Sequence, residues 1–116
     1  MLRKLPNYDW NLECGRDGNG LENILGCYGW DSDTSDCSQR IFALSELPGG
    51  IARDLEGWKD DYDPDSIYPP IVVEFFGGRY NVIDGNHRII LFREWGFTHV
   101  PAWFVREKQE NSHAAA

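Results

Sequence analysis

The fold is decided by the stretch Pro70-Ile71-Val72-Val73-Glu74-Phe75-Phe76-Gly77-Gly78-Arg79-Tyr80-Asn81-Val82-Ile83. Both halves of this stretch are rich in β-branched and aromatic residues, which favour the extended conformation. The two glycines between them can adopt positive φ angles at little cost, as the tight turn of a hairpin requires. We therefore predict a β-hairpin with strands at residues 70–76 and 79–83.

The residues after this hairpin predict a turn, a helix and a last strand. Asp84-Gly85-Asn86 is a cluster of residues that interrupt regular structure. The helix follows from His87 to Trp95, with an apolar face made by Ile90, Leu91 and Trp95, and Gly96 ends it. Val100 to Val105 is apolar enough to form a final strand.

The region before the hairpin predicts one strand, Arg40 to Leu44, and one helix, Ile51 to Trp58. The apolar residues of the helix recur at spacings of four and three, so they share one face. Residues 1–39 mix aromatic residues with glycines and show no sustained period. We expect them to form an irregular segment packed on the domain, with at most a short helix around Leu21 to Leu25.

The order of these elements is strand, helix, hairpin, helix, strand, which predicts a small α+β domain over residues 40–105. We expect a short mixed sheet that contains the hairpin, with the helices flanking it. The acidic run from Asp31 to Asp36 is expected to be a solvated loop, and residues 106–116 a polar tail.

A chain of 116 residues suffices for one compact domain, and its 41% apolar and 14% aromatic content can form a core. Nineteen acidic and 11 basic side chains give a formal net charge of -8. Such a surface repels a phosphate backbone, so nucleic-acid binding is disfavoured. The sequence has no apolar run long enough to span a bilayer and no secretory signal at its start. We expect a cytoplasmic protein without a membrane partner.

Three cysteines, Cys14, Cys27 and Cys37, are present at wide and unequal spacings. An odd number without a Cys-x-x-Cys pair is not the pattern of a disulfide framework. We expect free thiols in a reducing compartment. Zinc binding would require the fold to gather these thiols with a histidine, and we assign no metal site.

The five residues Asp84-Gly85-Asn86-His87-Arg88 hold the groups that an anion site needs. The first amides of the helix lack intrahelical acceptors, and either a capping side chain or a phosphate can supply one. Gly85 lets a ligand approach the backbone, while His87 and Arg88 offer hydrogen-bond donors. Asp84 and Asn86, taken singly, are explained equally well as helix caps. Their concentration beside His87 and Arg88 predicts a phosphate-binding turn.

Three stretches of the sequence resemble the ParB/sulfiredoxin superfamily. They are Tyr68 to Val73, Arg79 to Arg88 with an Asp-Gly-x-His-Arg signature, and Gly96 to Ala102 with a Gly-x-x-x-Val-Pro pattern. Ile41 to Leu47 is similar to the opening strand of that superfamily. The resemblance covers about residues 40–105, and it implies a small α+β fold whose signature turn holds nucleotide phosphates.

The resemblance implies several activities, which include cytidine-triphosphate switching, sulfinic-acid reduction, phosphorylation of free serine and nuclease action. Sulfiredoxins place a catalytic cysteine immediately before the His-Arg pair, where this chain has Asn86, so sulfiredoxin activity is disfavoured. Partition proteins of the ParB type carry an arginine-rich version of the turn that this chain lacks. The serine-kinase branch has the same Asp-Gly-x-His-Arg signature.

The first hypothesis is therefore a nucleotide-binding domain that transfers a phosphoryl group, with ATP, ADP or CTP as the nucleotide and Mg²⁺ as its companion ion. The catalytic residues that this resemblance implies are Asp84, His87 and Glu46, the last as general base. The phosphate-binding residues that it implies are Gly85, Asn86, His87 and Arg88. A different explanation of Glu46 is an exposed carboxylate that complements a helix dipole.

Two other functions are left open by the sequence. A ParB-like nuclease would need a basic groove, for which the arginines of the C-terminal third are the candidates. A non-enzymatic interaction module would use the tryptophans and tyrosines of residues 8–30 to bind a protein partner or to form a homodimer.

Overall fold

The structure is a computed structural model that describes residues 2–13, 20–49 and 62–108. The predicted helix Ile51 to Trp58 lies outside these residues, as does Cys14. Within the described ranges, no helix is long and apolar enough to cross a membrane.

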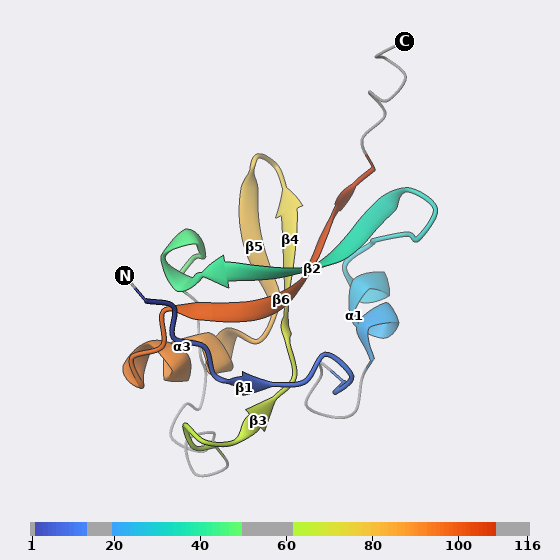
Figure 1. Ribbon diagram of the computed structural model, residues 1–116. Helices are drawn as coiled ribbons and strands as arrows, with labels where there is room; N and C mark the ends of the chain where they lie inside the picture. Colours follow the sequence, from blue (N-terminus) through green and yellow to red (C-terminus); the bar gives the residue numbers. More distant parts are fainter. Residues whose placement is uncertain (1, 14–19, 50–61, 109–116) are drawn as a thin grey trace.

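Four strands form one mixed sheet in the order β2-β6-β4-β5 (Figure 1). Strand β2 (Ser35–Ala43) pairs antiparallel with β6 (His99–Glu107). Strand β6 then pairs parallel with β4 (Ile71–Phe76), which pairs antiparallel with β5 (Arg79–Asp84). The predicted α+β class with a short mixed sheet is confirmed.

The predicted hairpin is also confirmed, as strands β4 and β5. Its two turn residues, Gly77 and Gly78, have φ angles of 65° and 79°. Positive φ at both central residues is the requirement that Gly-Gly meets in a tight hairpin turn. The turn therefore fixes the register in which β4 and β5 pair.

Helix α3 (Asn86–Glu94) follows the hairpin and packs on one face of the sheet through Ile89 and Phe92. Of the predicted apolar face, Leu91 is buried and Trp95 packs against the core, whereas Ile90 is only half-buried and Ile89 is fully buried in its place. Ile89 and Ile90 are identical neighbours, so the sequence does not distinguish which of them is buried. The packing of α3 on the sheet determines this. The core on this face comprises Phe42, Leu44, Leu47, Tyr68, Ile71, Val73, Ile89, Phe92, Val100, Ala102 and Phe104.

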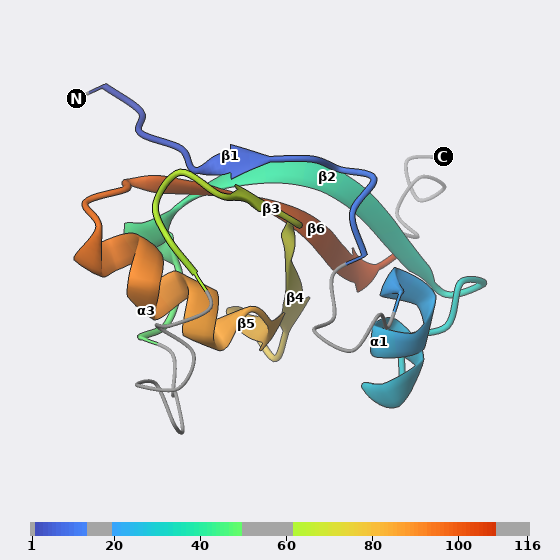
Figure 2. The same cartoon turned by 90° about the horizontal axis from the view of Figure 1, so that it is seen from below.

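Helix α1 (Leu21–Cys27) is the short helix expected near Leu21 to Leu25, and it covers the other face of the sheet. Its Ile24 packs against Val72 and Ile83. Figure 2 shows α3 and α1 on either side of β4. The sheet is therefore the middle layer between two helices, of which α1 has one buried residue and α3 has four.

The amino-terminal segment is tied to the domain at two places. Strand β1 (Asn7–Tyr8) pairs parallel with β3 (Ile67–Tyr68). Further along, the ring of Trp10 meets the ring of Trp103 on β6 edge to face, with centroids 5.3 Å apart. Aromatic contacts of this kind add to the burial of apolar surface.

Strand β2 begins at Ser35, five residues before the predicted start at Arg40. Residues 35–39 are polar and mostly exposed, so they lack the apolar alternation by which a strand is recognised. They form a strand because they pair with residues 103–107 of β6. Asp36 is thus part of a strand, whereas Asp31 to Thr34 form the expected exposed turn.

Candidate functional site at the turn between β5 and α3

The turn between β5 and α3 has a backbone conformation that favours glycine. Gly85 is the N-cap residue of α3 and has a φ angle of 108°. A Cβ at this position would overlap Cγ2 of Ile71 and would lie 2.8 Å from its Cβ. Gly85 therefore packs directly on the first residue of β4, and this contact seats the start of α3 against the sheet.

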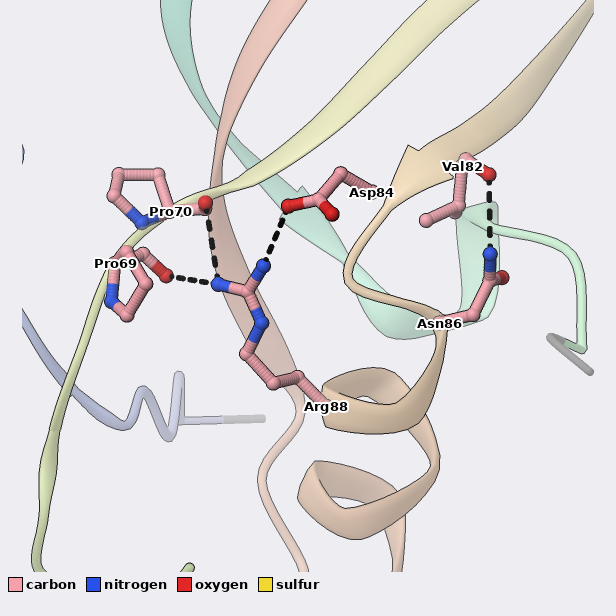
Figure 3. Close-up of polar contacts among 6 residues, drawn as sticks. All are labelled: Pro69, Pro70, Val82, Asp84, Asn86 and Arg88. Atoms are coloured by element: carbon pink, nitrogen blue, oxygen red, sulfur yellow. Dashed lines mark hydrogen bonds and ion pairs between the residues drawn. The ribbon is translucent and has the colours of Figure 1, made fainter. Parts of the chain in front are cut away.

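Arg88 is the buried charge of the turn, with 5% of its surface exposed. Its Nη1 donates to the carbonyl oxygens of Pro69 at 2.7 Å and Pro70 at 3.3 Å, and its Nη2 donates to Oδ2 of Asp84 at 2.8 Å (Figure 3). One side chain thereby links the entry to β4, the end of β5 and the first turn of α3. The guanidinium faces protein oxygens, so this geometry gives Arg88 a positioning role in the turn.

Asp84 keeps one carboxylate oxygen for other partners. Its side chain is 26% exposed, and Oδ2 is bound by Arg88. Burial raises the pKa of Asp84 above its ordinary value of 3.8, although the charge and hydrogen bond of Arg88 act in the opposite direction. A carboxylate of this kind can join phosphate oxygens in holding Mg²⁺ or can accept a proton.

The helix begins without a side-chain cap. Gly85 has no side chain to offer, and the N-cap position makes no side-chain hydrogen bond. Asn86 donates from Nδ2 to the carbonyl oxygen of Val82 at 3.3 Å, while Asp84 is bound to Arg88. Figure 3 shows these two side chains on opposite sides of the turn. The explanation of Asp84 and Asn86 as caps of α3 therefore does not apply.

His87 lies in the first turn of α3 and is partly buried. Together with Asp84, Gly85 and Asn86 it forms the surface that surrounds the positive end of the helix dipole. These predicted site residues are close together because they are consecutive at one junction.

Glu46 is not brought to this junction. Its Oε1 accepts the backbone N–H of Ala43 at 2.9 Å, and its Oε2 lies 3.7 Å from Nη2 of Arg40. The short 3-10 helix η1 (Leu44–Glu46) contacts the last turn of α3, where Arg93 donates to the carbonyl oxygen of Leu44 at 2.8 Å. The turn lies at the other end of α3, at its start. Glu46 therefore acts as a capping residue of η1.

A shallow cavity of about 310 Å³ lies beside the second half of α3. Its lining residues are Tyr62, Pro64, Leu91, Glu94 and Trp95. Leu91, Glu94 and Trp95 follow His87 at spacings of four, seven and eight, which place them on the same face of the helix. By this spacing, the helix residues that line the cavity share a face of α3 with His87.

No group of three or more His, Cys, Asp or Glu side chains gathers as a metal site within the described ranges. The described cysteines, Cys27 and Cys37, are free thiols. Mg²⁺ bound with a nucleotide does not need such a group, because one or two carboxylates and the phosphate oxygens usually hold it.

Sequence reasoning did not find the partners of Arg88 on the strand side. The spacing of four residues between Asp84 and Arg88 is a signal for their ion pair. The carbonyl oxygens of Pro69 and Pro70 carry no such signal, because any residue supplies a carbonyl. The contact of Gly85 with Ile71 depends on the packing of α3 and is equally invisible in the sequence.

A scan against protein-family models and searches of the curated proteins and of the solved structures give no match. The geometry of the turn therefore carries the functional argument.

We predict that Arg88→Ala lowers the free energy of unfolding by about 3 kcal/mol, because it leaves two carbonyl groups and a half-buried carboxylate without their donor. Urea denaturation measures this loss. The matched control is Arg79→Ala, since Arg79 is exposed at the hairpin and its loss should stay below about 0.5 kcal/mol. Equal effects of the two substitutions would contradict the positioning role of Arg88.

We predict that Gly85→Ala destabilises the fold more than Gly78→Ala. Both glycines have positive φ, but a Cβ at Gly78 meets nothing within 4 Å, whereas a Cβ at Gly85 meets Ile71. Backbone strain alone costs about 1 kcal/mol, and the overlap with Ile71 adds at least about another 1 kcal/mol. Thermal and urea unfolding of the two variants give the comparison, and equal losses would show that the close packing is not needed.

The raised pKa of Asp84 predicts a pH dependence of stability. The folded protein binds this proton more tightly than the unfolded chain, so the stabilisation is complete below the ordinary pKa of 3.8. It is lost as the pH rises through the pKa of the folded state. We therefore expect the unfolding free energy of the wild type minus that of Asp84→Asn to fall as the pH rises above 3.8 and through the pKa of the folded state. A difference that rises with pH would contradict the direction of the shift.

Proposed function

We propose that this protein binds the phosphates of a nucleotide, such as ATP, ADP or CTP, at the turn from Asp84 to Arg88. The observation that carries the proposal is the start of α3, where the N-cap makes no side-chain hydrogen bond although two side chains suited to capping flank it. A phosphate supplies the acceptor that the helix start requires, and it gains from the positive end of the helix dipole.

The rigidity of the turn supports this proposal. Gly85 is packed on Ile71, and Arg88 joins three segments of the chain. A site whose backbone is fixed before binding loses little conformational entropy when the ligand arrives. Because the charge of Arg88 is directed to Asp84, the phosphates are held mainly by backbone dipoles and by His87.

The cavity beside α3 favours a nucleotide over a bare phosphate. Its volume of about 310 Å³ is at the lower end of the range for small-molecule sites. Trp95 and Tyr62 supply aromatic surface for a base, at the far end of the helix face that begins with His87. A nucleotide with its phosphates at the turn would extend along this face.

The reaction that fits these groups is phosphoryl transfer to a hydroxyl acceptor. The bond from the terminal phosphorus to its bridging oxygen breaks, a bond to the acceptor oxygen forms, and the acceptor proton passes to Asp84 as the nucleoside diphosphate leaves. Asp84 is proposed for this step in place of Glu46, because it is the carboxylate at the turn and burial raises its pKa. Mg²⁺ would be held by the phosphates, because the carboxylate oxygen of Asp84 that Arg88 does not bind is the one that receives the proton.

The nuclease alternative has less support. A nucleic-acid backbone needs a basic surface, whereas the chain carries a net charge of -8 and its turn pairs the buried Arg88 with a carboxylate. We therefore propose that the ligand is a small nucleotide and not a nucleic acid.

We predict that Asn86→Asp weakens nucleotide binding about tenfold, because it adds a negative charge beside the phosphates. The same substitution removes the hydrogen bond that Asn86 donates to the carbonyl of Val82, and the preference for an acidic residue in the first turn of a helix offsets part of that loss. Isothermal titration calorimetry with ATP, ADP and CTP, each with Mg²⁺, measures the affinity.

Gln39→Glu is the matched control, because it makes the same amide-to-acid change on β2, at the opposite edge of the sheet from β5. Its affinity should equal that of the wild type within about twofold. Absence of binding by all three nucleotides at millimolar concentration would contradict the proposed function, and so would equal weakening in the two variants.

A further inference from the structure

The outer edge of β2 is unpaired among the residues that the structure describes. Strand β2 lies at the edge of the sheet, and its described partner is β6 on the other side. Nine residues, Ser35–Ala43, run in a continuous register with Glu107–His99. Strands at a sheet edge are commonly protected by proline, by a bulge or by short length, and β2 has none of these.

The direction of the backbone groups of β2 follows from its ladder. The N–H of Leu44 donates to Thr98, and the N–H of Lys108 donates to Thr34, so even-numbered residues of this strand direct their N–H and C=O groups to β6. Odd-numbered residues direct theirs outward. Of the outward N–H groups, that of Ala43 is bound by Glu46. Within the described ranges, those of Ser35, Cys37, Gln39 and Ile41 have no partner.

The side chains of this edge are accessible as well. Asp36, Cys37, Ser38 and Gln39 are all exposed. The segment that could pair with another strand is therefore residues 35–41, and the carboxylate of Glu46 closes its far end.

We propose that a second copy of this chain adds its β2 to this edge, antiparallel, with Ser38 on the twofold axis. Charge complementarity points to a second copy, because in this register Asp36 of each copy lies opposite Arg40 of the other. Within its own chain the guanidinium of Arg40 lies over the ring of Phe42, with 4.3 Å between Cζ and the ring centroid, and 3.7 Å from Oε2 of Glu46. Arg40 is partly exposed, and its side chain would turn towards the edge to meet Asp36 of the other copy. Asp36 and Arg40 are even-numbered, and their backbone groups point to β6. Across the new edge they therefore form non-hydrogen-bonded pairs, in which side chains approach most closely.

The neighbouring symmetric registers lack this match. A twofold axis at Cys37 places Asp36 opposite Ser38, and an axis at Gln39 places Asp36 opposite Phe42. An axis at Arg40 places the two arginines opposite each other, which like charges disfavour. Backbone geometry alone allows any of these registers, and the charges select the one centred on Ser38. Because Asp36 and Arg40 of one copy match Arg40 and Asp36 of the other, a second copy complements the charges of this edge.

The register is tested by disulfide formation in the full chain with Cys14, Cys27 and Cys37 replaced by serine. In Ser38→Cys the two thiols face each other across the axis at a Cα separation of about 4.5 Å, which suits a disulfide. In Ser35→Cys the two thiols are six residues apart along the strands, about 20 Å. Under a glutathione redox buffer we expect Ser38→Cys to form covalent dimers at least about tenfold faster than Ser35→Cys.

The association itself is tested by sedimentation velocity on the chain with its native cysteines under reducing conditions. Asp36→Arg places two arginines opposite each other in each contact, and we expect the dimer dissociation constant to rise about tenfold or more. Asp65→Arg makes the same charge change at an exposed site away from β2, and it should leave the constant unchanged.

A wild type that stays monomeric at several hundred micromolar would overturn the proposal. Equal rates of cross-linking in Ser38→Cys and Ser35→Cys would overturn it too, as would equal effects of the two charge substitutions. Neither test involves a nucleotide, so failure here is distinct from failure of the proposed function.

Discussion

The structure of the turn depends on the buried guanidinium of Arg88. Among the described residues, the carbonyls of Pro69 and Pro70 and the carboxylate of Asp84 accept its hydrogen bonds. A buried charge is tolerated only where such partners satisfy it, and removal of one partner leaves a costly unpaired group. The hairpin, the turn and the helix are therefore held in one arrangement, because each supplies part of the environment of Arg88.

This arrangement separates the tasks of neighbouring residues in the motif. Arg88 and Gly85 position the backbone, the first by binding three oxygens and the second by packing on Ile71. Asp84 and Asn86 direct their bonded atoms away from the helix start, to Arg88 and Val82. The start of α3 therefore has no side-chain hydrogen bond at its N-cap, and the carboxylate of Asp84 and His87 belong to the same turn. These are the groups that phosphate binding and phosphoryl transfer use.

Much of the fold could be predicted because its signals are local, whereas the details of the site depend on contacts between distant residues. The Gly77-Gly78 turn and the two strands beside it are encoded within a few residues. The first half of β2 is polar and became a strand only through its pairing with β6. In the same way, the sequence predicts Arg88 as a phosphate ligand, whereas in the structure it donates to the carbonyl oxygens of Pro69 and Pro70. Glu46 resembles a general base until its bond to the N–H of Ala43 is seen.

We propose that a nucleotide binds through its phosphates at the start of α3. The direct test is titration of the ¹⁵N-labelled protein with ATP and Mg²⁺, followed by the chemical shifts of backbone amides. We expect the largest shifts in residues 85–88, with smaller ones along the helix face towards Trp95. Inorganic triphosphate should reproduce the shifts at the turn and not those near Trp95. Shifts spread over the surface, or confined to residues away from the turn, would contradict the account.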